Sequence, residues 1–231
     1  MRSFFVDIQA KEGTIIKLPV AESKHACKVL RMQEGQNLSI VNGKGSVYTA
    51  KITVPNPKEC VVKIITVHHQ KPTNFEIHIA IAPTKNIDRF EWFLEKSTEL
   101  GINKITPLLC SNSERKNIKM DRLNKVLIAA MKQSKRFYLP ELSQAVQFDD
   151  FIKNNPNGLI AHCYDDNKTS LQSVIKPINC PILIGPEGDF TEKEVEMALI
   201  NGFTSVNLGN TRLRTETAGL YACMLAKNKF E

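Results

Sequence analysis

The chain has 231 residues, of which 42% are hydrophobic and 24% are charged, and it carries a net charge of +7 at pH 7. This length and composition are those of a globular protein with one large domain or two smaller ones. No run approaches the roughly 20 apolar residues that cross a bilayer, and the apolar stretch Phe4-Phe5-Val6 is too short for a signal peptide. We therefore expect a cytoplasmic protein.

The spacing of the six cysteines argues against a CxxC redox motif and against a zinc site. No two of them are closer than 17 residues, so the chain has neither a CxxC pair nor the ligand spacing of a zinc site. Disulfide frameworks are typical of shorter chains that are richer in cysteine. Because several cysteines lie in apolar runs, we expect buried free thiols and no metal.

The basic residues gather in two blocks. Residues 1–73 carry 11 basic and 5 acidic side chains, and residues 111–140 carry 8 and 2, so each block has a net charge of +6. The segments 74–110 and 141–231 have net charges of −1 and −4. A polyanion such as nucleic acid would contact the two basic blocks. Charge that serves only solubility is the alternative interpretation.

Residues 1–70 are rich in strand signals. Runs of β-type residues alternate with turn residues such as Asn42-Gly43 and Gly45, which suit hairpins. We expect a small β-barrel with a basic face, a fold that often binds RNA. The strands are expected at residues 2–8, 14–18, 36–42, 46–54 and 60–68.

One helix is expected in this first domain, over residues 22–32. Its apolar positions, among them Ala26 and Val29, would share one side. On a helix, residues three apart are neighbours. The polar side would therefore carry His25, Lys28 and Arg31.

A polar segment with a proline, at residues 69–74, marks a domain boundary. After it strands and helices alternate, which favours a parallel α/β domain. Pro107 interrupts one expected strand, so we expect that strand to lie at an edge of the sheet or to end early. The strands are expected at residues 75–82, 104–110 and 158–163, and the helices at 88–100, 121–135 and 148–154.

Residues 181–222 contain two glycine turns, and each turn follows an apolar run and precedes a helix. The first turn is Gly185 to Gly188, and the second is Leu208 to Asn210. In parallel sheets, ligands bind at the carboxyl ends of the strands. We therefore expect the two turns to form one small-molecule pocket, although a tight turn without a ligand is the alternative for the first.

The two helices of this stretch have recognisable starts. Thr191 and Glu194 match the capping box, so we expect a helix to begin there. At the second turn we expect Thr215 as the N-cap, with Arg212, Arg214 and Glu216 around the helix mouth. The arginines indicate an anionic ligand there, or an acidic side chain that pairs with them.

Taken together, these stretches resemble the RsmE family of SPOUT-class RNA methyltransferases. The resemblance runs nearly end to end and keeps the order of the motifs, which makes it specific. The matching motifs are R-x-F at Arg2 and Phe4, H-x-x-x-V-L-R at 25–31, K-x-x-E-L-G at 96–101, Q-S-x-R-x-x-x-P at 133–140, GPEG with F-[ST]-x-x-E at 185–194, and LG-x-x-x-LR-x-ETA at 208–218.

The resemblance implies methylation of a uridine at N3 in 16S rRNA, with S-adenosylmethionine (AdoMet) as the methyl donor. It implies a PUA-like RNA-binding domain at residues 1–71, and a SPOUT methyltransferase domain with a trefoil knot at residues 74–231. It also implies a homodimer that acts on 16S rRNA of the small ribosomal subunit. The cofactor-binding residues carried over are Ile184, Gly185, Pro186, Glu187, Gly188, Leu208, Gly209, Leu213, Thr217 and Ala218, with Ala161-His162 as a looser match.

The chemistry of the transfer suggests roles for three side chains. Loss of the N3 proton leaves negative charge on the uracil oxygens, and we hypothesise that Arg214 stabilises it, with Arg212 as the second candidate. Glu216 would orient the arginine or take the proton. The residues expected to face RNA are Arg2, His25, Lys28, Arg31, Arg115, Lys116 and Arg136.

Two positions depart from the family's pattern. The family usually reads GPEGG, and Asp189 stands in place of the last glycine. Because Asp tolerates unusual φ values, we expect the turn to survive. Lys132 stands where Glu is more usual. Two alternative functions would have other signatures: an RNA-binding assembly factor without methyl transfer would show a damaged cofactor loop, and a nucleotide-binding enzyme would show GxGxxG or a Walker loop. The sequence has neither signature.

Overall fold

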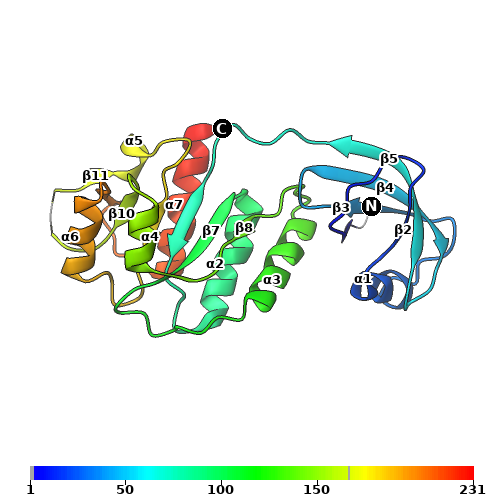
Figure 1. The fold of residues 1–231 in the computed structure, drawn as a ribbon, viewed down its shortest axis with the longest axis horizontal. Coiled ribbons are helices and arrows are strands. Elements are labelled where there is room, and N and C mark those ends of the chain that lie inside the picture. The colour runs from blue at the N-terminus through cyan, green and yellow to red at the C-terminus, as the bar shows by residue number, and fades with distance from the viewer. Residues whose placement is uncertain (1–2, 166) are drawn as a thin grey trace. The chain divides into compact units, whose positions relative to one another are not determined.

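The computed structural model of the chain describes residues 3–165 and 167–231 (Figure 1). Contacts divide it into two compact units. The N-terminal unit comprises Met1–Pro72 and Ile128–Leu139, and the C-terminal unit comprises Thr73–Leu127 and Pro140–Glu231. The expected division is into two consecutive domains, at residues 1–71 and 74–231. The structure differs in that the segment 128–139 groups with the N-terminal unit.

The N-terminal unit is built on a five-stranded sheet with the order β1-β3-β4-β5-β2. β1 pairs in parallel with β3, and the other neighbours are antiparallel. Register shifts along β4 and β5 mark bulges, which increase twist and bend a sheet. Phe4, Ile40 and Tyr48 are among the side chains buried in its core. The strands are β1 (Ser3–Phe5), β2 (Ile15–Lys17), β3 (Asn37–Val41), β4 (Ser46–Val54) and β5 (Val61–His69).

The helix expected at residues 22–32 is shorter and changes type. It consists of α1 (Val20–Lys24) and a π-helical turn, η1 (His25–Val29). The wider π turn shifts the helical phase, so Val29 is 70% exposed although it was expected on the apolar side. Arg31 lies beyond the helix, in a left-handed conformation with φ of 51°. A hydrogen bond from the N–H of Met32 to the Ala26 carbonyl caps the C-terminal end of the helix. The expected helical pairing of Lys28 with Arg31 is therefore wrong.

The C-terminal unit contains an eight-stranded sheet, and its strand pairs are parallel, as predicted. The order is β11-β13-β10-β12-β6-β7-β8, and β9 pairs with the far end of β7. The strands are β6 (His78–Ile81), β7 (Lys104–Leu109), β8 (Glu141–Leu142), β9 (Val146–Gln147), β10 (Leu159–Ala161), β11 (Thr169–Ser170), β12 (Ile182–Ile184) and β13 (Thr204–Asn207).

The expectation that Pro107 would place its strand at an edge, or end it early, is wrong. β7 runs on to Leu109, and it lies between β6 on one side and β8 with β9 on the other. β8 pairs with β7 up to Ile105, and β9 begins at Leu108. Pro107 therefore lies opposite the gap between these two short strands, where its missing N–H removes no ladder bond.

Helices cover both faces of the parallel sheet. On one face, α7 contacts β6, β12 and α2. A Cβ on Gly219 of α7 would lie 2.7 Å from Ile81 and 2.8 Å from Phe93, so glycine permits this close packing. On the other face, α4 and α6 cover a core that includes Ala80 and Ala82. The helices of this unit are α2 (Ile87–Leu100), α3 (Met120–Gln133, which continues into the N-terminal unit), α4 (Phe148–Asn154), α5 (Leu171–Val174), α6 (Glu192–Ile200) and α7 (Thr215–Phe230).

In residues 3–165 and 167–231, no helix has the length and apolar character needed to cross a membrane.

Candidate functional site

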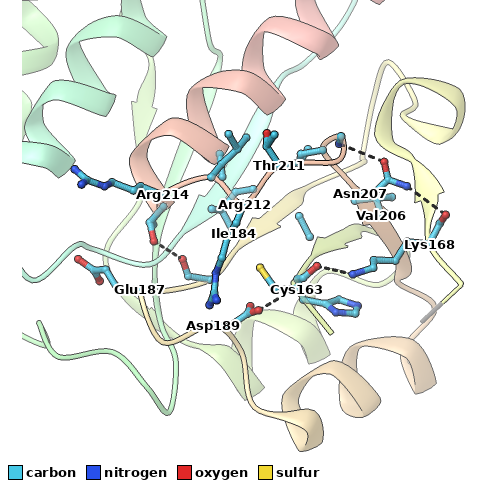
Figure 2. A pocket seen from close by; sticks show the side chains of 18 of the residues that line it. Cys163, Lys168, Ile184, Glu187, Asp189, Val206, Asn207, Thr211, Arg212 and Arg214 are labelled. Carbon is cyan, nitrogen blue, oxygen red and sulfur yellow. Dashed lines mark hydrogen bonds between the residues drawn. The ribbon is translucent and has the colours of Figure 1, made fainter. Parts of the chain in front are cut away.

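A cavity of about 640 Å³ lies at the carboxyl ends of three neighbouring strands, β13, β10 and β12 (Figure 2). Ala161, Ile184 and Val206 end these strands or lie near their ends, and all three line the cavity. Its volume is typical of ligand pockets, which measure about 300–1,000 Å³. Both glycine turns contribute to its wall, so the prediction that they form one pocket is confirmed.

Most residues predicted to bind the cofactor line this cavity. Gly188 and Thr217 are not part of its lining as far as the described residues define it. The cofactor role of every member of the set stays a prediction. The predicted residues in the wall are Ile184, Gly185, Pro186, Glu187, Leu208, Gly209, Leu213 and Ala218.

The start of α7 is tied to the end of β12. Arg214 is the N-cap of α7, and Thr215, the residue expected at that position, is the first helical residue. The Thr215 hydroxyl donates 3.0 Å to the Gly185 carbonyl instead of capping the helix. This side chain therefore joins the two turns of the site, a contact between residues 30 positions apart that local sequence rules do not predict.

The capping box at the start of α6 is confirmed. The Thr191 hydroxyl accepts from the Glu194 N–H at 3.3 Å, and the Glu194 carboxylate accepts from the Thr191 N–H at 2.8 Å. The same carboxylate also accepts from the N–H of Ser111, at 2.8 Å, and from its hydroxyl, at 3.1 Å. One buried carboxylate thus fixes both the helix start and the loop that follows β7.

Asp189 occupies a left-handed backbone conformation, with φ of 64°. Its N–H donates 2.9 Å to the Pro186 carbonyl, which closes the turn. The turn expected to survive the aspartate is therefore present. The carboxylate lines the cavity and accepts from the N–H of Cys163 at 2.7 Å and from the N–H of Phe190 at 2.8 Å.

The second turn has a different construction. Gly209 has φ of 108°, and beyond the glycine and its two chain neighbours no atom lies within 4 Å of the point that a Cβ would occupy, so this part of the wall is open. The Asn207 side chain supports the turn by accepting from the Gly209 N–H at 3.3 Å and donating to the Lys168 carbonyl at 3.4 Å (Figure 2). Asn207 and Lys168 were not predicted, because neither belongs to a motif that the sequence displays.

The two arginines point in different directions. Both line the cavity, but Figure 2 shows the side chain of Arg212 extending toward Cys163 and Asp189, whereas that of Arg214 points away from them. Cys163 is exposed, so the expectation of a buried thiol is wrong for this residue. Partial desolvation, followed by the Asp189 carboxylate, raises the pKa of the Cys163 thiol, and the charge of Arg212 opposes this shift. Arg212 is therefore the arginine that brings positive charge to this side of the cavity.

Glu216 does not belong to the lining that the described residues form. It is 7% exposed, in the first turn of α7, where a carboxylate is stabilised by the helix dipole. One of its oxygens lies 3.9 Å from Nε of Arg89 on α2. Arg89, which the sequence did not single out, is thus the basic residue that faces Glu216.

The segment after β10 forms another part of the wall. Nε2 of His162 lies 2.9 Å from the Ser205 hydroxyl, and His162, the looser match of the sequence, is buried in the lining. The ammonium group of Lys168 donates to the carbonyls of His162, at 2.9 Å, and of Tyr164. The backbone of this segment is therefore held by side chains.

The residues predicted to face RNA are distributed over both units. Arg2 lies outside the described residues. In the N-terminal unit, Lys28 and Arg31 are exposed, and His25 lies 4.0 Å from Glu22. Arg136 belongs to the segment 128–139 of the same unit. Lys132 of that segment, which departs from the family's pattern, forms a 2.6 Å ion pair with Glu22.

In the C-terminal unit, Arg115 has a structural contact that was not predicted. Its guanidinium donates to the carbonyls of Thr84, at 3.0 Å, and of Lys85, at 2.6 Å. Lys116 beside it is exposed. Arg115 thus supports the loop before α2, and its contact with RNA stays a prediction.

Comparison with known proteins places the chain in a family. Residues 71–227 match the sequence model of the RNA methyltransferase domain, and residues 18–65 match that of the RNA methyltransferase PUA domain. The first match covers more than half of the chain.

Individual relatives agree with this placement. The ribosomal RNA small subunit methyltransferase E of Synechocystis is 30% identical over 91% of this chain and 71% of its own, and that of Rickettsia conorii is 28% identical over 94% and 91%. The enzyme of the same name from Neisseria gonorrhoeae, solved with S-adenosyl methionine bound, is 27% identical, covers 97% of this chain and 95% of its own, and superposes with a TM-score of 0.84. The chain therefore belongs to the RsmE family of RNA methyltransferases, with a PUA-like N-terminal domain and a parallel α/β methyltransferase domain.

Proposed function

We propose that this protein methylates a uridine of 16S rRNA at N3, with AdoMet as the methyl donor, in the cytoplasm and as a homodimer. The observation that carries this proposal is the cavity at the ends of β13, β10 and β12, whose wall contains both glycine turns. Family membership supports the reaction class, and the names of the relatives support the small-subunit RNA as substrate.

The lining of the cavity fits a molecule with the chemistry of AdoMet. Ile184, Val206 and Leu213 offer an apolar wall that suits an adenine ring. The loop at Gly209 leaves room for a ligand to approach the backbone. Glu187 and Arg212 offer charges of both signs for the ammonium and carboxylate groups of the methionine part. When bound, AdoMet supplies a methyl group that its sulfonium has already activated.

The residues of the chain align the acceptor and stabilise its charge. Uracil N3 lies on the pairing edge, so the base has to be unpaired or flipped out of its helix. Arg214 stabilises the negative charge that the uracil oxygens carry once N3 has lost its proton. Its side chain points away from Cys163 and Asp189, whereas that of Arg212 extends toward them (Figure 2), so Arg214 is the arginine that we assign to the acceptor base. Arg212 is the second candidate for this role.

Glu216 supports this arrangement from behind. Its carboxylate is buried and faces Arg89, which agrees with an orienting role at the start of α7. The alternative role, acceptance of the N3 proton, requires its carboxylate to reach the acceptor base. A Glu216→Gln variant separates the two roles, because a lost general base changes the dependence of kcat on pH whereas a lost orienting contact lowers kcat at every pH.

The remaining parts of the proposal concern the assembly. A trefoil knot in the loops of the cavity and a homodimer are supported by family membership alone. Exposed basic residues support contact with RNA phosphates, among them Lys28 and Arg31 in the N-terminal unit and Lys116 in the C-terminal unit. A steep loss of RNA affinity between low and physiological salt is the expected sign of such contacts.

The test is nucleoside analysis of treated RNA. The protein and AdoMet are incubated with small subunits or rRNA that lack the modification, and the nucleosides are identified by mass spectrometry. We expect N3-methyluridine. Arg214→Ala should lower kcat by about 100-fold with AdoMet binding retained, whereas Lys193→Ala, an exposed charge on α6, should have little effect. Full activity of Arg214→Ala would refute its assignment. RNA binding without any modified nucleoside would favour the assembly factor.

A further inference from the structure

The Asp189 carboxylate connects two loops of the cavity that lie far apart in the sequence. One oxygen accepts from the N–H of Cys163, at 2.7 Å, in the segment after β10. The other accepts from the N–H of Phe190, at 2.8 Å, in the loop after β12. Hydrogen bonds to a charged acceptor are among the stronger ones in proteins, so this carboxylate holds the two loops together. We call these two hydrogen bonds of Asp189 the joint between the loops.

The joint has support on both sides. The Tyr164 hydroxyl donates to the Phe190 carbonyl at 2.8 Å, in parallel with the bond from Cys163 to Asp189. The Asn112 amide donates to the carbonyls of Gly188, at 3.1 Å, and of Asp189, at 3.0 Å. The backbone of Asp189 is thereby held in its left-handed conformation, and its carboxylate is directed at the segment 162–164.

The geometry points to Asp189 as a positioning residue for the cofactor: its carboxylate holds the 162–164 wall against the loop after β12 and so sets the shape in which the cavity binds AdoMet. This inference rests on the proposed function, since it assumes that AdoMet occupies this cavity. His162 and Cys163 line the same cavity as Asp189, so a movement of their segment changes the wall directly.

Two variants separate the carboxylate from the backbone conformation. Asp189→Gly keeps the left-handed backbone and removes the carboxylate. Asp189→Asn tolerates the same φ and keeps one acceptor oxygen for the Cys163 N–H, but removes the charge. The matched control is Asn179→Gly, an exposed residue of the same unit that also has a positive φ, of 53°, and does not belong to the cavity lining.

The expected result is a change in cofactor affinity without an equal change in turnover. The dissociation constants of AdoMet and of its product S-adenosylhomocysteine are measured by calorimetry for each variant. Loss of a charge-assisted bond should weaken both ligands about tenfold in Asp189→Gly and less in Asp189→Asn. KM for AdoMet should rise by a similar factor, and kcat at saturating AdoMet should change less than about threefold. Asn179→Gly should bind like the original chain.

The product provides the decisive comparison, because its sulfur carries no charge. If Asp189 acts by direct attraction to the sulfonium, its variants weaken only AdoMet, and the positioning role is overturned. Unchanged affinity of Asp189→Gly for both ligands also overturns it. Failure of the original chain to bind AdoMet overturns the proposed function and this inference together, whereas binding by the original chain with unaltered variants overturns the inference alone.

Amide hydrogen exchange tests the joint itself and does not depend on the ligands. The Cys163 N–H should exchange faster in Asp189→Gly and keep part of its protection in Asp189→Asn. The amides of α6 should be unaffected, which shows that the variant is folded. Equal protection of the Cys163 N–H in all variants would show that the carboxylate does not hold the segment.

Discussion

Replacing Glu194 by alanine is expected to destabilise the C-terminal unit by about 2–3 kcal/mol. The Glu194 carboxylate is 5% exposed and accepts four hydrogen bonds, two from Thr191 and two from Ser111. Loss of its part of the capping box costs about 1 kcal/mol. The backbone N–H of Ser111 also loses its acceptor, at about 1–3 kcal/mol when buried. Ser111 is exposed, so water replaces part of its lost bonds and the total stays near the lower end.

Thermal unfolding followed by circular dichroism measures this loss. For a chain of this size, 2–3 kcal/mol lowers Tm by about 4–12 °C. The matched control is Glu192→Ala, which removes an exposed carboxylate from the first turn of the same helix and costs less than about 1 kcal/mol. Glu194→Gln should fall between the two, because it keeps one acceptor oxygen. An equal Tm for the Glu194→Ala and Glu192→Ala variants would contradict the reasoning.

Three further predictions concern other parts of the C-terminal unit. Burial lowers the pKa of His78 to about 4, so the unfolded chain binds a proton near pH 6.5 that the folded chain binds only near pH 4. The free energy of unfolding should therefore fall by on the order of 2 kcal/mol between pH 7 and pH 4.5. Urea titrations should show a smaller fall for His78→Gln. Asp189→Asn removes a carboxylate that raises the pKa of Cys163, so iodoacetamide should alkylate this thiol faster at pH 8. An unchanged alkylation rate, followed by mass spectrometry, would count against the contact between Asp189 and Cys163. Gly219→Ala should lower stability by about 1–2 kcal/mol in urea titrations, because overpacking against β6 and α2 outweighs the higher helix propensity of alanine.

Features that depend on short stretches of sequence could be predicted. The capping box of α6 needs only Thr191 and Glu194, and the structure has both of its reciprocal bonds. The alternation of strands and helices after residue 74 indicated a parallel sheet, in which both glycine turns lie at the carboxyl ends of the strands. The common position of the two turns thus follows from a general property of parallel sheets and needs no long-range information.

Features that depend on the partner of a residue could not be predicted. The π turn at His25–Val29 has no signal in the sequence, and helical periodicity with a period of 3.6 residues assigned Val29 to the wrong side. Pro107 is compatible with an internal strand only because two short strands leave a gap beside it. Both errors arise because a local rule gives the preference of a residue, whereas the fold decides which neighbour that residue has.

The charged residues of the site illustrate the same limit in chemical terms. The sequence grouped Arg212, Arg214 and Glu216 because they lie within five positions, yet the structure directs Arg212 into the cavity and places Glu216 against Arg89, 127 residues earlier. Arg212 lies in the loop before α7, Arg214 is its extended N-cap and Glu216 belongs to its first turn, so the three side chains leave backbone of different conformation. Neighbours in the sequence therefore face different surroundings, and a single charged mouth divides into one side that faces the cavity and another that packs against α2. A role inferred for such a cluster has to be assigned residue by residue, which is why variants of Arg212, Arg214 and Glu216 should have different kinetic effects and not one shared loss.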